Sequence, residues 1–220
     1  MNLAELEIAL NRGNDALGHA REAVDLSQEK MQTFLHNSLI YLGAAQRLLG
    51  DRAGAKEALE KAYDLVRDKA IEPYVRVTIL RELGRSLEEE NPTRAQAALR
   101  LSLSVANEIK NPTLSDKEYL DGALSLLESY LRTGRLKYAR RLVRQIRERE
   151  SRMDPETKKK KGFARRKMAL ERLALEVSWK VDVPRDPALR DSVLRGILKN
   201  FRESLRPREP LAQSKALFLL

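Results

Sequence analysis

The stretch YLGAAQRLLGDRAGAKEALEKAY, residues 41–63, holds three glycines within a pattern that otherwise favours helix. A glycine inside a helix costs about 1 kcal/mol relative to alanine, so each one needs a packing or turn explanation. Gly43 is followed by Gly50-Asp51 and then by small, large and small side chains at Ala55, Leu59 and Ala62. This spacing predicts two antiparallel helices in close contact, joined where glycine ends the first helix and aspartate caps the second.

The same signature recurs on both sides of this stretch. Downstream, Leu83-Gly84 is followed by a turn at Asn91-Pro92 and by a predicted inward stripe of Ala97, Leu101 and Ser104. A third unit has Gly134 at the turn and a stripe of Ala139, Val143 and Ile146, and an upstream helix carries Ala16, Ala20 and Ala23. Ala62, Ser104 and Ile146 stand 42 residues apart, which predicts a repeat of that length.

These residues resemble the tetratricopeptide repeat, in which Leu-Gly lies at the crossing in the first helix and Gly-Asp forms the turn. The period exceeds the family's length of about 34 residues, so the resemblance is to long-helix relatives of the family. It covers residues 2–152. It implies an all-α fold, a right-handed α-solenoid of about five antiparallel helical hairpins.

Periodicity and capping residues predict the individual helices. The expected ranges are 2–11, 14–28, 31–49, 52–69, 73–89, 92–109, 115–133, 135–152, 157–181 and 187–205. Ser115 to Glu118 fit a capping box, and Asp154-Pro155 and Asp186-Pro187 fit helix starts. Residues 3–28 also fit one continuous helix, although the Asn, Gly and Asp in NRGND favour a break. We expect TPR-like repeats at 1–152, and at 153–220 a basic segment, a long helix and a C-terminal capping helix with an apolar tail.

Composition argues against a catalytic role. The chain has no cysteine and only two histidines, His19 and His36, and it lacks the common metal, nucleotide and nucleophile motifs. We therefore expect no catalytic residue, no metal site and no cofactor. The N-terminus does not fit a secretory signal, and no run approaches the ~20 apolar residues of a membrane span, which predicts a cytoplasmic protein.

Positive charge is concentrated in one segment. The chain carries a net charge of +10, of which residues 132–172 contribute +12 and residues 1–131 contribute −5. The candidate basic patch consists of Lys137, Arg140, Arg141, Arg144, Arg147, Lys158, Lys159, Lys160, Lys161, Arg165, Arg166 and Lys167. Four lysines in the first turns of a helix would oppose its dipole, so the run 158–161 is either a loop or a contact for an acidic partner. Alternatively, the whole patch is a solvated face.

The family resemblance also implies a groove lined by the first helix of each hairpin. The matching positions are Asn37, Ile40, Ala44, Arg47, Thr78, Arg81, Arg85, Glu88, Asp121, Leu124, Glu128 and Arg132. Arg47, Arg81 and Arg85 would form a positive strip suited to an acidic peptide. They could equally pair with Glu82, Glu88 and Glu128 on neighbouring helices.

The expected function is a non-catalytic protein–protein interaction or scaffold module that binds a segment of an acidic protein or peptide partner in this groove. One alternative is a nucleic-acid-associated protein that uses the basic segment 132–172. Another is a helical sensor or regulatory domain that binds a peptide or small ligand. The apolar end ALFLL, residues 216–220, either docks on its own chain or forms a homodimer contact.

Overall fold

The computed structural model describes residues 3–10, 12–67, 71–182, 195–196 and 199. Helices account for the regular structure of these residues, and none of them lies in a strand. The all-helical fold class is therefore confirmed. The chain divides into two compact units, Met1–Ser125 and Leu126–Leu220, so that the boundary falls inside one helix.

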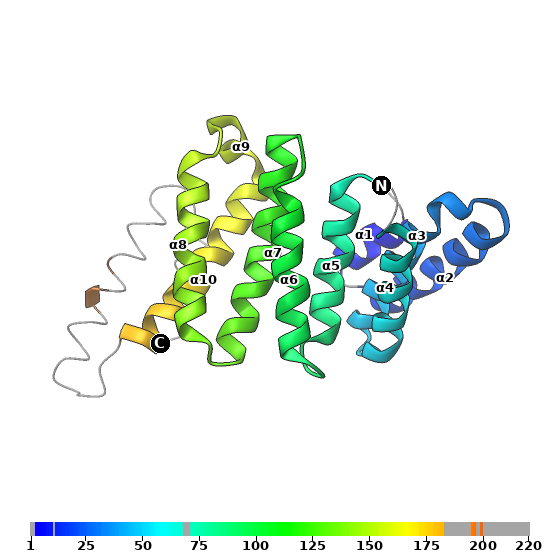
Figure 1. The fold of residues 1–220 in the computed structure, drawn as a ribbon, viewed down its shortest axis with the longest axis horizontal. Helices are drawn as coiled ribbons and strands as arrows, with labels where there is room; N and C mark the ends of the chain where they lie inside the picture. The colour runs from blue at the N-terminus through cyan, green and yellow to red at the C-terminus, as the bar shows by residue number, and fades with distance from the viewer. Residues whose placement is uncertain (1–2, 11, 68–70, 183–194, 197–198, 200–220) are drawn as a thin grey trace. The chain divides into compact units, whose positions relative to one another are not determined.

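The first unit contains six complete α-helices, a short 3₁₀ helix and the beginning of a further α-helix. They are α1 (Leu3–Ala9), α2 (Gly13–Lys30), η1 (Gln32–Phe34), α3 (Leu35–Leu48), α4 (Arg52–Val66), α5 (Pro73–Leu87), α6 (Pro92–Ala106) and α7 (Pro112–Arg132). From α1 to α6, each α-helix packs against the next, and α3 also contacts α1 and α5 (Figure 1). Within this unit the helices therefore stack in chain order, with first helices of neighbouring hairpins in contact. The predicted right-handed solenoid of about five helical hairpins stays a prediction.

The N-terminal segment forms two helices, since α1 ends at Ala9 and α2 begins at Gly13. The break between Ala9 and Gly13 falls at the beginning of the predicted segment NRGND, whose Gly13, Asn14 and Asp15 already belong to α2. His19 of α2 and the buried Glu7 of α1 hold the two helices together, with 2.8 Å between Nδ1 and Oε2. The pKa of His19 is raised, chiefly by this hydrogen bond to Glu7.

Close helix contacts occur at two predicted glycines. A Cβ atom added to Gly43 of α3 would lie 2.6 Å from Cγ of Leu59, and one added to Gly84 of α5 would lie 2.6 Å from Cγ of Leu99. Ala55 and Ala95 supply the backbone oxygen at 3.1 Å in the respective contacts. Both hairpins therefore use the same arrangement, in which only a hydrogen atom fits between the helices.

The contact between Gly84 and Leu99 shows that the inward-facing residues of α6 were predicted wrongly. Ala97, Leu101 and Ser104 are exposed, and Leu101 leaves 45% of its surface accessible. The buried stripe instead consists of Ala95, Leu99 and Ser102, two residues earlier. The uniform spacing of 42 residues was therefore wrong. In the third unit, the predicted stripe of Ala139, Val143 and Ile146 is buried.

Caps and turns fix the ends of the helices. Gly50 has φ of +83° and Gly134 has φ of +68°, the left-handed conformation that glycine adopts without strain. The side chains of Asp51, Asn91 and Asp154 accept hydrogen bonds from the amides of Gly54, Arg94 and Thr157. The predicted cap at Asp186 lies outside the described residues.

The capping box at Ser115 was wrong. Helix α7 begins at Pro112, where the side chain of Asn111 accepts a hydrogen bond from the amide of Leu114 at 2.9 Å. Ser115 lies inside the helix, and its hydroxyl donates to the backbone oxygen of Ala106 at 2.8 Å. Asn111-Pro112 thus repeats the start already seen at Asn91-Pro92 in α6.

The second unit contains the end of α7 and the helices α8 (Leu136–Arg152), α9 (Pro155–Lys159) and α10 (Lys161–Asp182). Helix α10 packs against both α8 and α9. It buries Phe163, Leu170, Leu173 and Val177, while Met168, Leu175 and Trp179 are half-buried. The predicted capping helix at 187–205 and the apolar tail lie outside the described residues.

The predicted helix at 157–181 was wrong in the region of the lysine run, residues 158–161. The helix is interrupted at Lys160, whose backbone is extended with ψ of 136°. Lys158 and Lys159 consequently lie in the last turn of α9, and Nζ of Lys158 also donates to the backbone oxygen of Ser151 at the end of α8, at 3.4 Å. Because helix C-termini favour cations, these two lysines do not oppose a dipole. The electrostatic argument for a partner at the run therefore fails.

The contact at Gly43 leads to a prediction about stability. Gly43→Ala should lower the free energy of unfolding by about 1–3 kcal/mol, because the new methyl group overpacks the crossing of α3 and α4. Gly18 is the matched control, since it also lies in a helix but has no atom within 4 Å of an added Cβ. Gly18→Ala should raise the free energy of unfolding by about 0.5–1 kcal/mol. Urea denaturation measures both changes, and equal effects in the two variants would contradict the close crossing.

Candidate binding surface

The candidate surface is a network of charged side chains on α3, α5 and α7, the helices that were predicted to line a groove. Arg47 of α3 reaches Glu82 of α5, with 3.2 Å between Nη2 and Oε2. Arg85, one turn after Glu82, approaches its other oxygen at 2.9 Å. Glu82 leaves only 9% of its side chain exposed, so two arginines from two helices neutralise one buried carboxylate.

The network continues from α5 to the beginning of α7. Nη1 of Arg81 lies 2.5 Å from Oε2 of Glu118, and Nζ of Lys117 lies 2.5 Å from the other oxygen of that carboxylate. Arg85 donates from Nε to the hydroxyl of Ser125 at 3.0 Å. Three successive first helices are thus joined by charge-assisted hydrogen bonds, which are stronger than bonds between neutral groups.

Burial and neighbouring charges have opposite effects on the pKa of Glu82 and on the pKa of Arg81. Burial by itself raises the pKa of Glu82, but Arg85, Arg47 and Arg81 outweigh it and hold the pKa below the usual range. Burial likewise lowers the pKa of Arg81, and the nearby Glu118, Glu82 and Asp121 more than compensate, so its pKa is raised. Both groups are therefore charged at neutral pH.

The predicted groove residues of the first unit are either buried or half-buried. Ile40 and Ala44 are buried, and Ile40 belongs to a core cluster with Ala62 and Val66, so neither residue can line a groove. The half-buried residues are Asn37, Arg47, Thr78, Arg81, Arg85, Glu88, Asp121 and Leu124. The hydroxyl of Thr78 donates to the backbone oxygen of Tyr74 at 3.0 Å. Apart from Leu124, the half-buried part of the predicted groove is therefore polar.

The last two groove residues lie in the second unit. Glu128 and Arg132 are exposed, and Glu128 pairs with Arg172 of α10 at 3.2 Å. Both residues border a hollow of about 440 Å³ whose other lining residues are Leu131, Arg172, Leu173, Glu176 and Lys180. Glu128 therefore forms an ion pair with Arg172 within its own unit. This pair was not predicted from the sequence.

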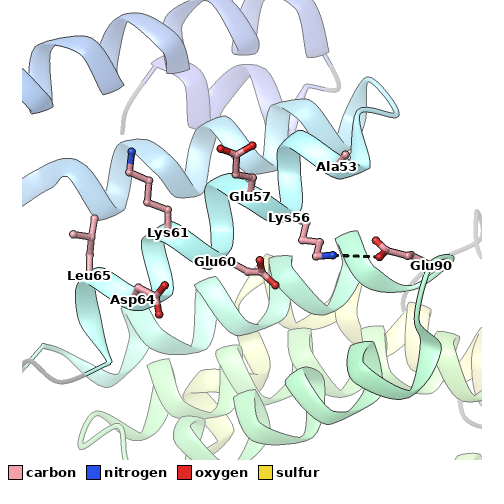
Figure 2. A pocket seen from close by; sticks show the side chains of 8 residues that line it. All are labelled: Ala53, Lys56, Glu57, Glu60, Lys61, Asp64, Leu65 and Glu90. Carbon is pink, nitrogen blue, oxygen red and sulfur yellow. Dashed lines mark hydrogen bonds and ion pairs between the residues drawn. The ribbon is translucent and has the colours of Figure 1, made fainter.

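Another hollow lies on α4, the second helix of its hairpin. The predicted groove did not include this helix. The hollow has a volume of about 730 Å³ and is lined by Ala53, Lys56, Glu57, Glu60, Lys61, Asp64, Leu65 and Glu90. Figure 2 shows these side chains along α4, with Lys56 extending toward Glu90 at 3.2 Å. Its lining holds two lysines and four carboxylates, so the hollow is acidic, and the exposed Lys56–Glu90 pair contributes little to stability.

The basic patch separates into paired and unpaired cations. Arg147 contacts the buried Glu171 at 2.9 Å, Lys167 contacts Glu150 at 3.6 Å, and Lys159 contacts Glu156 at 2.5 Å. Arg166 donates to the backbone oxygen of Gly162 at 2.8 Å, and Arg140 also has an interaction partner. Lys160 and Arg165 are exposed, and Lys161 begins α10. Among the described residues, no carboxylate pairs with Lys137, Arg141 or Arg144, all three of which are exposed on α8.

Sequence reasoning missed Lys117, Glu118 and Ser125 as members of the charged network. A signal existed, because oppositely charged residues recur at roughly one repeat length. Arg47 and Glu82 are 35 residues apart, and Arg81 and Glu118 are 37 residues apart. The pairs Arg52–Glu89, Lys56–Glu90 and Arg94–Glu60 follow the same rule on the second helices and the turns.

Comparison with known protein families, with curated proteins and with solved structures found no match. Every helix in the described part of the chain is too short or too polar to cross a bilayer. In the same residues, no three His, Asp or Glu side chains gather in a group that could hold a metal ion.

The ion network predicts a pH-dependent effect of Glu82. Glu82→Gln should lower the free energy of unfolding at pH 7 by about 3 kcal/mol, because it leaves Arg47 and Arg85 without their counter-charge in a buried site. Glu90→Gln is the matched control, since Glu90 pairs with Lys56 at an exposed site, and its effect should stay within about 1 kcal/mol. Urea denaturation at several pH values measures both variants.

The sign of the pH effect follows from the lowered pKa of Glu82. A carboxylate whose pKa is depressed by folding stabilises the protein above its ordinary pKa of 4.5, and this contribution is lost as the pH falls through the lower pKa of the folded state. The difference between wild type and Glu82→Gln should therefore be constant near neutrality and shrink below about pH 4.5. A difference that grows on acidification would contradict the assigned role.

Proposed function

We propose that this chain is a non-catalytic protein–protein interaction module, a long-helix relative of the tetratricopeptide repeat. It binds an extended segment of a partner protein along the half-buried polar surface of α3, α5 and the beginning of α7. The stacking of α1 to α6 in chain order supports this proposal, since such a stack places equivalent faces of the first helices next to each other.

The observation that carries the proposal is the arrangement of Arg47 and Arg85 around Glu82. A guanidinium has five N–H donors, and Arg85 uses Nε and Nη1 in its bonds to Ser125 and Glu82. Arg47 donates to Glu82 from Nε, and its Nη2 lies 3.2 Å from the same oxygen. Arg47 leaves 24% of its side chain exposed, compared with 36% for Arg85. Both side chains are thus held in place while further donors remain to bind a ligand.

The charge of this surface indicates the chemistry of the partner. The carboxylates of Glu82 and Glu118 are buried. In contrast, Arg47, Arg85 and Lys117 leave 24%, 36% and 50% of their side chains exposed, so the accessible charge of this network is mainly positive. A carboxylate of the partner would accept two parallel hydrogen bonds from an arginine whose side chain is already ordered, so little entropy is lost on binding. An acidic peptide segment is the partner that fits.

A random peptide display library provides the test, with the whole chain as the target. We expect enriched peptides to contain Asp or Glu, and their affinity for Arg47→Gln/Arg85→Gln to fall at least tenfold. Arg21→Gln/Arg100→Gln is the matched control, because both arginines are exposed on other helices and the change in net charge is the same. That variant should bind the peptides as wild type does.

Thermal melting shows first that both double variants are folded. Enriched peptides without acidic residues, or peptides that bind the two variants equally, would refute the arginine surface as the binding site. A library that yields no enriched peptide would refute the proposed function.

A further inference from the structure

Three exposed cations without an ion pair among the described residues lie on helix α8 of the second unit. Helix α8 buries Ala139, Leu142, Val143 and Ile146. Lys137, Arg141 and Arg144 lie three or four residues apart on the opposite side, and we call these three residues the basic stripe. At 1.5 Å per residue, neighbouring members are about 4.5–6 Å apart along the helix axis.

The basic stripe differs from most of the basic segment because, among the described residues, no ion pair neutralises its charges. Arg147, Lys159 and Lys167 are paired with Glu171, Glu156 and Glu150. Lys158 donates to a backbone oxygen at the end of α8. No described carboxylate pairs with a member of the stripe, although these side chains stand on a helix that is fixed by its buried face.

The surroundings of the stripe distinguish among polyanionic partners. The apolar face of α8 is buried in the protein, so the helix cannot insert that face into a membrane. The described hollows lie on α4 and beside α10, so no described pocket at the stripe accepts the side chains of an acidic peptide. The stripe is an exposed row of cations along one helix, the form that suits contact with regularly spaced phosphates.

Aromatic side chains near the stripe indicate which form of nucleic acid fits. Phe163 is only 9% exposed, and the ring of Tyr138 packs against Tyr130 with 5.6 Å between the ring centroids. Binding of single strands relies on aromatic rings that are free to stack on bases. Tyr138 still leaves 56% of its surface exposed, so of these two rings it is the one accessible to a base. A single accessible ring does not form a series of stacking platforms, which favours a duplex.

We propose that the basic stripe of α8 binds the phosphate backbone of double-stranded nucleic acid without reading its sequence. Each member contacts one phosphate and releases its condensed counterions. This activity is separate from the proposed peptide surface, because it lies on other residues in the other unit. The lysine run at 158–161 takes little part, since Lys158 and Lys159 are already engaged.

Salt dependence of binding tests this proposal. The full chain is titrated onto a short fluorescein-labelled DNA duplex at about 50 to 200 mM salt, the range over which phosphate contacts lose most of their affinity. Lys137→Gln/Arg141→Gln/Arg144→Gln should weaken binding and reduce the log–log salt slope by about 2.7, which is about 0.9 for each lost phosphate contact. Melting temperatures should be unchanged, because the three side chains are exposed and glutamine is a good helix former.

The matched control removes the same charge from paired positions. Lys158→Gln/Lys159→Gln/Lys167→Gln should change the slope by less than about 1, because these lysines are already engaged. Equal loss in the two triple variants would overturn the proposal, since only net charge would then matter. A wild-type chain without salt-dependent duplex binding, or one that prefers a single strand, a polyglutamate peptide or an anionic lipid vesicle, would also overturn it. These results leave the peptide display experiment independent.

Discussion

Backbone proximity at Gly43 and Gly84 sets the distances on which the rest of the first unit depends. At both positions a leucine side chain and an alanine backbone oxygen of the following helix occupy the space where a Cβ would lie. Because the contact is the same in both hairpins, α3 meets α4 as α5 meets α6. The close pairing allows α3 to touch α5 as well as α4. This contact between first helices is what brings Arg47 to 3.2 Å from Glu82, so the surface chemistry follows from two missing side chains.

Charge then fixes the alignment of neighbouring hairpins. The exposed pairs on the second helices, such as Lys56–Glu90, have little energetic value because water competes for both partners. Glu82 differs, since its burial would be costly without Arg47 and Arg85. A slip of α5 along α3 by one helical turn, about 5.4 Å, would separate Arg47 from this carboxylate. The buried pair therefore disfavours other alignments, whatever its net contribution to stability.

Local signals made the helices and their ends predictable, and contacts between helices account for the errors. Gly50-Asp51 and Asp154-Pro155 were found because turn geometry and capping depend on adjacent residues. The stripe of α6 was placed two residues too late because ALRLSLS offers two series of small and large side chains, and the length of the preceding turn selects between them. The start of α7 was predicted at Ser115, but the helix begins at Pro112 and Asn111 caps it. The binding partners of Arg81 and Arg85 could not be read from local pattern, because they lie on another helix.

Positive charge in the second unit is best understood from where helices end. A continuous helix through TKKKKGF would have exposed four lysines at its beginning, but the interruption at Lys160 places two of them at the end of α9 instead. Lys158 donates to a backbone oxygen at the end of α8, and Lys159 pairs with Glu156. Net charge by segment therefore overstates the importance of the run and understates that of α8. The cations on α8 need no ordering of the backbone before they meet a ligand, because the buried face already holds the helix. An equal number of charges in an unstructured segment would lose more entropy on binding, so position on a rigid helix matters more than the number of lysines.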